Sequence, residues 1–140
     1  MDYFLDTNFL VGLWRQPKHG PEVDFLARHP DQVMGLSWMA KGEFLRGAVV
    51  AGHAAESVER FLSTLPVTWP SESTLIRYAR VFADLRAKRQ MIGPNDLWIA
   101  ASALEHGLPL VTRNIEEFRR VEGLVVVDYV AMLNSVGGEG

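Results

Sequence analysis

The chain has 140 residues, of which 48% are hydrophobic and 22% charged, a composition typical of a globular protein rather than a disordered one. Its formal net charge of −3 argues against a protein that coats nucleic acid without specificity. The absence of cysteine excludes disulfide bonds, thiol catalysis and cysteine-ligated zinc. The sequence shows no signal peptide and no apolar run of the ~20 residues that cross a bilayer, so we expect a cytoplasmic protein that spans no membrane.

The first half of the chain alternates short apolar segments with segments of helical periodicity. A buried strand at residues 3–6 precedes a helix through residues 9–14, a break at 16–20 and a short helix at 21–28. A strand at 33–36 then leads into a helix that Ser37 caps and that ends near Gly52. Another helix follows through residues 58–63, and residues 66–69 are a short strand candidate.

The second half continues the same alternation. Ser71 opens a long helix to about Arg89, and a loop at 91–94 precedes a helix that carries Asp96 and stops at Gly107. A strand at 108–112, a helical turn at 115–118 and a last strand at 124–127 complete the elements. Short apolar strands between amphipathic helices predict an α/β fold, a mostly parallel central sheet flanked by helices. We expect one domain over residues 1–134 and a flexible tail over 135–140.

Two carboxylates fall on faces that the helical periodicity makes apolar. At about 100° per residue, Glu43 lies in an arc formed by Leu36, Met39, Ala40, Gly47, Val50 and Ala51. Asp96 is flanked in the same way by Leu97, Ile99, Ala100, Ala103 and Leu104. A buried carboxylate without a partner costs several kcal/mol, so such groups face a cation or several hydrogen-bond donors.

The carboxyl ends of the strands are expected to bring these acids together with a third one. Asp6 ends the first strand and Thr112 ends a later one, and ligand sites in open α/β sheets lie beyond the carboxyl ends of the strands. The helices that carry Glu43 and Asp96 begin near the same edge. Hard oxygen ligands without His or Cys favour Mg²⁺ or Mn²⁺, which can activate water for phosphodiester hydrolysis.

Each acid also has a simpler interpretation. Asp6 could cap a helix, and Asp96 could favour the positive end of its own helix dipole. Glu43 could be neutralised by Arg46 or Lys41. Three groups of basic residues could hold phosphate, or could form solvated faces and helix ends: Arg15, Lys18 and His19; Arg86, Lys88 and Arg89; Arg113, Arg119 and Arg120.

Four segments, in order, resemble the motifs of PIN-domain ribonucleases, in particular toxins of the VapC type. They are the residues 5–8 (LDTN), 43–47 (EFLRG), 93–101 (GPNDLWIAA) and 107–114 (GLPLVTRN), the last followed by Glu117-Phe118 and Val121-Glu122-Gly123-Leu124. Lys41-Gly42, ahead of the second segment, is less typical of the family. The resemblance extends from residue 3 to about residue 130, nearly the whole chain.

The resemblance implies a PIN-like three-layer sandwich, dependence on Mg²⁺ or Mn²⁺, endonucleolytic cleavage of RNA and a cognate VapB-like antitoxin. By position, Asp6, Glu43 and Asp96 match the metal-coordinating acids of the family. The position of the family's frequent fourth acid is occupied by Asn114, so Glu117 is a candidate for the missing charge. Thr112 is expected to orient water or a ligand through its hydroxyl group; otherwise it is an ordinary strand-end threonine.

An apolar stripe opposite Glu43 favours association with another chain. Trp38, Leu45 and Val49 form it, and Trp14 and Trp98 also lie off the expected core faces. The resemblance implies a homodimer with an antitoxin segment in an apolar groove. Alternatively, the long helix at 71–89 covers the stripe within one chain.

Two other functions remain open at this point. One is a PIN nuclease with a housekeeping role in RNA processing and no antitoxin. The other is a catalytically inactive PIN module that binds RNA or protein, although intact Asp6, Glu43 and Asp96 argue against it.

Overall fold

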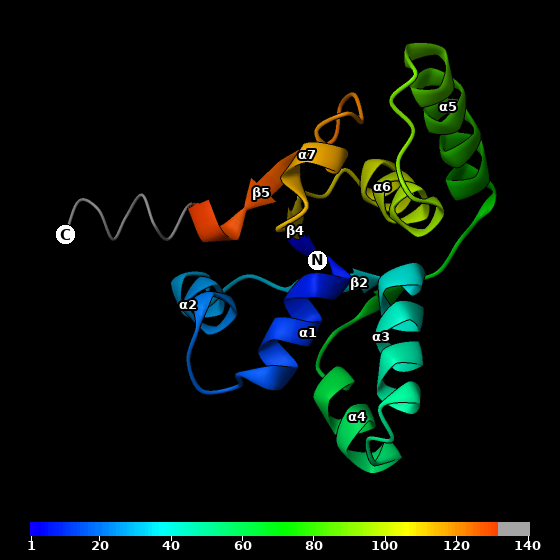
Figure 1. Ribbon diagram of the computed structural model, residues 1–140. Helices are drawn as coiled ribbons and strands as arrows, with labels where there is room; N and C mark the ends of the chain where they lie inside the picture. The colour runs from blue at the N-terminus through cyan, green and yellow to red at the C-terminus, as the bar shows by residue number, and fades with distance from the viewer. Residues whose placement is uncertain (132–140) are drawn as a thin grey trace.

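The computed structural model describes residues 1–131 and consists of a parallel sheet with helices on both faces (Figure 1). Its strands are β1 (Tyr3–Leu5), β2 (Met34–Ser37), β3 (Val67–Thr68), β4 (Leu110–Thr112) and β5 (Val126–Asp128). Its helices are α1 (Thr7–Arg15), α2 (Pro21–Arg28), α3 (Trp38–Val50), α4 (Ala55–Leu62), α5 (Glu72–Lys88), α6 (Pro94–His106) and α7 (Ile115–Phe118).

The five strands lie in the order β3-β2-β1-β4-β5, and every neighbouring pair is parallel. Phe4 of the central strand β1 pairs with Gly35 on one side and with Leu110 on the other. Strands covered on both faces bury successive residues, which explains why β2 and β4 are buried at every position and are mostly apolar. This sheet confirms the predicted α/β class and its parallel strands.

Each face of the sheet has its own hydrophobic core, which makes the fold three-layered. Phe4 and Leu110 of the sheet pack with residues of α5 and α6, among them Leu85 and Ile99. On the opposite face Leu5 and Val111 pack with residues of α1, α2 and α4. The carboxyl ends of β1 and β4 emerge between these two layers, where α1 begins and where the chain leaves β4 for α7.

Most predicted elements agree with the structure to within a few residues. Helix α4 begins at Ala55, earlier than expected, and the strand expected at 66–69 contains only Val67 and Thr68. Ser37 and Ser71 are the N-cap residues of α3 and α5, as predicted. The tail predicted at 135–140 lies outside the described residues. Among residues 1–131, none of the helices combines the length and apolar character of a membrane span.

The predicted inner face was correct at Leu36 and Ala40 but wrong in the second half of α3. The buried residues are Ala40, Phe44 and Ala48, whereas Val50 is 83% exposed and Gly47 lies at the surface. The helix is rotated from the expected orientation because Phe44 stacks on Phe61 of α4, with ring centroids 5.2 Å apart. Glu43 therefore lies at the border of the buried face rather than at its centre.

The apolar stripe on α3 is covered in part within the chain. Tyr78 of α5 stacks on Trp98 of α6 at 3.7 Å between centroids, and Trp98 contacts Trp38 edge-on at 5.6 Å. The alternative interpretation, with the long helix as cover, is therefore correct for Trp98, whose ring in turn contacts Trp38. Leu45 and Val49 remain 36% and 77% exposed.

Candidate functional site

Asp6 is the buried centre of the site, at the carboxyl end of β1. Its side chain is almost fully enclosed, although it is charged at neutral pH in an ordinary environment. One carboxylate oxygen accepts a hydrogen bond from the backbone N–H of Thr7 (2.8 Å), and the other accepts one from Oγ1 of Thr112 (2.7 Å). Asp6 thus caps α1, as the simpler interpretation suggested, and also joins the ends of β1 and β4.

Thr112 and Asn114 extend this contact from β4 to the helix that carries Asp96. The fully buried hydroxyl of Thr112 donates to Asp6 and accepts the backbone N–H of Asn114 (2.9 Å). The Asn114 amide Nδ2 lies 3.2 Å from Oδ2 of Asp96 and 3.2 Å from Oε2 of Glu117. Thr112 is therefore more than a strand-end residue, and Asn114 connects two acids from two elements.

Glu43 joins the same edge from α3. Its carboxylate accepts the hydroxyl of Thr7 (2.7 Å) and the side-chain amide of Asn95 (3.2 Å). Arg46 reaches it only at 3.9 Å, and the Arg46 side chain is 69% exposed. Water screens such an exposed ion pair, so Arg46 neutralises Glu43 only weakly.

Burial and neighbouring acids raise the pKa of Asp6 and the pKa of Asp96. Burial raises the pKa of Asp6; hydrogen bonds from Thr112 and Thr7 oppose the rise and the charge of Glu43 adds to it. Burial, the charge of Asp6 and a hydrogen bond and charge from Glu117 raise the pKa of Asp96 from 3.8 to about 7. Both shifts show that the negative charge of this cluster is poorly compensated by the protein itself.

The composition of the site fits a divalent metal ion with several water ligands. Within residues 1–131, Arg46 provides the one ion pair to these acids. No three His, Cys, Asp or Glu side chains in that part of the chain form a set that would hold an ion by themselves. Mg²⁺ usually takes one or two protein carboxylates and keeps several waters, so a complete protein cage is not required. Asp6, Asp96 and Glu43 supply oxygen donors of the type that Mg²⁺ and Mn²⁺ prefer.

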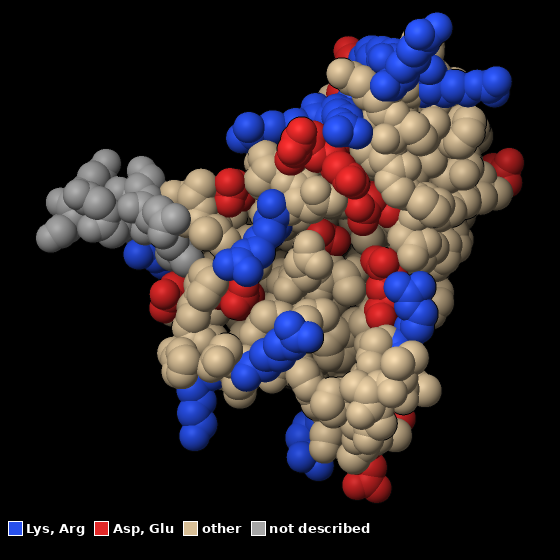
Figure 2. Space-filling view, in the orientation of Figure 1, with Lys and Arg blue, Asp and Glu red and all other residues tan. Residues whose placement is uncertain are grey.

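Basic side chains surround the acids on this face of the molecule. Figure 2 shows acidic groups gathered near the centre of the view, with Lys and Arg side chains around them. Such a pattern combines a region that attracts cations with a rim that attracts phosphate.

Sequence analysis missed two hydrogen-bond donors to Glu43 and one buried acid elsewhere. Thr7 follows Asp6 in the chain and Asn95 precedes Asp96, so their positions next to predicted acids could have identified them as site residues. Glu22 of α2 is only 4% exposed, and its Oε2 accepts the hydroxyl of the fully buried Tyr129 at 2.7 Å. Gly12 makes room for it, because an added Cβ would lie 2.5 Å from the Glu22 carboxyl carbon.

Comparisons with known proteins agree with this geometry. The PIN domain family matches residues 3–124. Ribonuclease VapC1 of Haemophilus influenzae (strain R2866) is 31% identical over 134 residues, covering 92% of this chain and 98% of that protein. The structure of VapBC-1 from nontypeable Haemophilus influenzae superimposes with a TM-score of 0.80 at 27% identity, covering 93% of this chain and 99% of that one. A toxin-antitoxin complex from Klebsiella pneumoniae gives a TM-score of 0.71 at 26% identity, over 91% of this chain and 98% of that one.

Proposed function

This chain belongs to the PIN-domain family, among the VapC ribonucleases, and from that premise we propose that it is a metal-dependent endoribonuclease and the toxin of a toxin–antitoxin pair. One observation carries the proposal: Asp6, Glu43 and Asp96 meet at one sheet edge with their charge poorly compensated. A purely structural cluster of acids would be matched by buried cations, whereas these three acids receive hydrogen bonds from neutral donors and one exposed ion pair. The substrate is RNA, and we place the activity in the cytoplasm.

The proposed mechanism assigns each residue of the cluster a role. A bound Mg²⁺ or Mn²⁺ would lower the pKa of an attacking water and stabilise negative charge on the phosphoryl oxygens. Asp6 and Asp96 would hold the ion, with Glu43 as a further ligand or as an acceptor for a water proton. Thr112 fixes the orientation of Asp6 through its 2.7 Å hydrogen bond. Asn114 donates to both Asp96 and Glu117 and so fixes them relative to each other. Glu117 would then add its negative charge to that of the proposed metal ligands.

The partners follow from the relatives and from the exposed part of α3. The complexes that this chain resembles point to a VapB-like antitoxin as its protein partner. Leu45 and Val49 remain exposed, and we assign this surface to association with another chain, including a homodimer.

Cleavage of RNA by the purified protein tests the proposal. Total cellular RNA would be incubated with the parent protein and with Asp96→Asn, each in Mg²⁺, Mn²⁺ or EDTA. We expect discrete fragments with the parent and metal only. Cleavage by Asp96→Asn at the parent rate, or cleavage in EDTA, would refute the assigned site. Absence of cleavage together with absence of metal binding in calorimetry would favour a module that only binds RNA or protein.

A further inference from the structure

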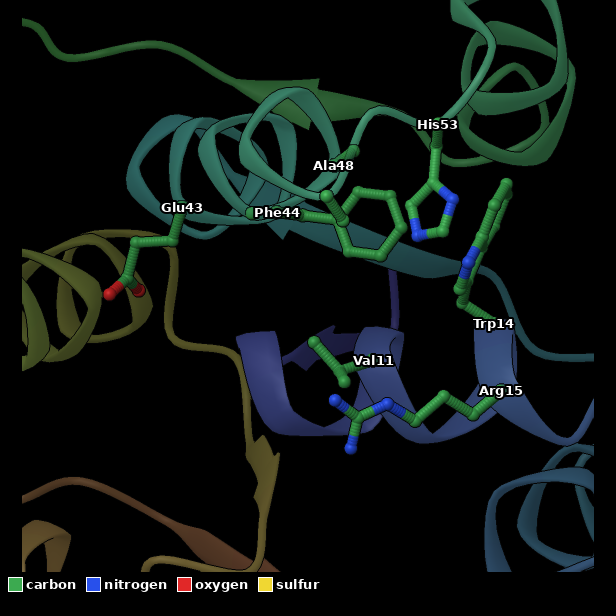
Figure 3. A pocket seen from close by; sticks show the side chains of 9 residues that line it. Val11, Trp14, Arg15, Glu43, Phe44, Ala48 and His53 are labelled. Atoms are coloured by element: carbon green, nitrogen blue, oxygen red, sulfur yellow. The ribbon is translucent and has the colours of Figure 1, made fainter.

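A cavity lies beside the acid cluster, between α1 and α3. It has a volume of about 150 Å³, and its lining includes Trp14, Arg15, Phe44 and His53. Glu43 also lines it, so the cavity opens directly from the site. Figure 3 shows the rings of Phe44, His53 and Trp14 on one side of the hollow and Arg15 on the other.

The position of the cavity suits the nucleotide next to a cleaved bond. Thr7, the first residue of α1, donates to Glu43 in the second turn of α3, and the cavity lining includes residues further along both helices. Gly47 is one turn beyond Glu43 on α3, and Arg15 is two turns beyond Thr7 on α1. At about 1.5 Å per residue these steps correspond to roughly 6 and 12 Å from the acids. An RNA strand whose phosphate lies at the acids would reach the cavity with its adjacent nucleotide.

The chemistry of the lining matches a base and its phosphate. A cavity of about 150 Å³ holds one planar six-membered ring in another protein. Aromatic side chains and arginine are the groups that bind unpaired bases, through stacking and cation–π contact. Arg15 has no carboxylate partner within ion-pair distance in the described chain. Its guanidinium turns back along α1 towards the end at which Glu43 lies (Figure 3), where a phosphate would pass.

We propose that the cavity between α1 and α3 is a subsite for one nucleotide of single-stranded RNA, adjacent to the scissile phosphate. The base lies among the aromatic rings that line the cavity, and Arg15 binds the phosphate. The subsite rests on the proposed function, because it assumes that the strand passes the acid cluster. An apolar peptide of a protein partner is the competing occupant, but it offers no anion to the exposed Arg15 side chain that lines the cavity.

Gly47 offers a way to fill the cavity without disturbing the fold. A Cβ added at Gly47 meets no atom within 4 Å, and the residue lines the cavity. Gly42 lies on the same helix, also has nothing within 4 Å, and does not line the cavity. Gly47→Leu and Gly42→Leu are therefore matched variants that differ only in whether the new side chain enters the proposed subsite.

The test measures RNA binding without cleavage. Both leucine variants would be made in the Asp96→Asn protein, and binding of a fluorescent single-stranded 12-nucleotide RNA of mixed sequence would be followed by anisotropy in EDTA. We expect Gly47→Leu to weaken binding about tenfold, the scale of one lost base stack, and Gly42→Leu to leave it unchanged. Equal affinity of the two variants, or no binding by either, would overturn the subsite.

Arg15→Gln tests the phosphate contact separately. We expect it to reduce the slope of log K against log salt by about one, whereas Arg28→Gln, on the exposed end of α2, would leave the slope unchanged. Weakened binding of the antitoxin by Gly47→Leu with unaltered RNA binding would assign the cavity to a protein partner and refute our proposal. Because the assay does not depend on catalysis, failure of the parent protein to cleave RNA would count against the proposed function alone.

Discussion

The molecule buries carboxylates in two places, and their surroundings differ. Glu22 faces the hydroxyl of Tyr129, and burial and Glu22 together raise the pKa of that hydroxyl, so the donor stays neutral. Asp6, by contrast, shares its site with Asp96 and Glu43: burial and the charge of Glu43 raise the pKa of Asp6, and burial and the charge of Asp6 raise the pKa of Asp96. Burial alone therefore does not identify a metal site. Within residues 1–131 the acids around Asp6 have no buried cation as a partner, and the proposed metal site rests on that difference.

The largest expected difference between the two places is in catalysis. Asp96→Asn removes a proposed metal ligand, and we expect the rate of RNA cleavage to fall by more than about a hundredfold. Loss of a residue that only hydrogen-bonds to a metal ligand costs up to about a hundredfold, and loss of the ligand itself should cost more. Glu22→Gln keeps an acceptor for Tyr129 and is expected to change the rate by less than about threefold. Initial rates on a fluorescent RNA in Mg²⁺ would measure both. A similar loss in the two variants would mean that the Glu22 pair also belongs to the active site.

Thr112 tests whether orientation of Asp6 matters beyond its charge. Thr112→Val removes the hydroxyl that donates to Asp6 and accepts from Asn114, so we expect cleavage to fall about 10–100-fold. Thr112→Ser retains the hydroxyl and is the matched control, expected to keep most of the activity. Metal affinity from calorimetry should fall in the valine variant alone. If valine and serine act alike, packing rather than the hydrogen bond is the role of Thr112.

The Glu22–Tyr129 pair is expected to contribute to stability only. Tyr129→Phe leaves a buried carboxylate without its donor, which costs about 1–3 kcal/mol. Urea unfolding in EDTA would measure this loss. The double variant Glu22→Leu with Tyr129→Phe removes both polar partners, so we expect it to be more stable than the sum of the two single changes predicts. Strict additivity would show that the pair does not interact.

The order of strands and helices could be predicted from sequence because each strand is a short apolar run between periodic segments. The acids of the site could be predicted because Asp6 ends a strand and Asp96 follows a loop at the same edge. The buried face of α3 could not be predicted, because this helix has apolar residues on all sides. Its orientation is selected by the stacking of Phe44 on Phe61 of α4. Glu22 was missed because an acid just after Pro21 looks like an ordinary first-turn residue.

A further expected effect concerns the pH dependence of stability without metal. Asp96 has a pKa of about 7 in the folded protein against 3.8 ordinarily, so the native state binds more protons between these values. The free energy of unfolding therefore falls as the pH rises from about 4 to about 7, and levels off above. Asp6, whose pKa is also raised, adds in the same direction. Tyr129 contributes nothing in this range, because its raised pKa keeps it neutral.

Asp96→Asn isolates this contribution. We expect the parent protein in EDTA to lose more stability than Asp96→Asn between pH 5 and pH 8, because the variant has no charge to accommodate at that position. Addition of Mg²⁺ should stabilise the parent more at pH 8 than at pH 5, since the ion binds the ionised acids and competes with the proton. The contrary result is a free energy of unfolding that rises from pH 5 to pH 8 more in the parent than in Asp96→Asn. It would mean that a cation within the fold matches Asp96, as a donor matches Glu22. The contrast between the two places would then disappear.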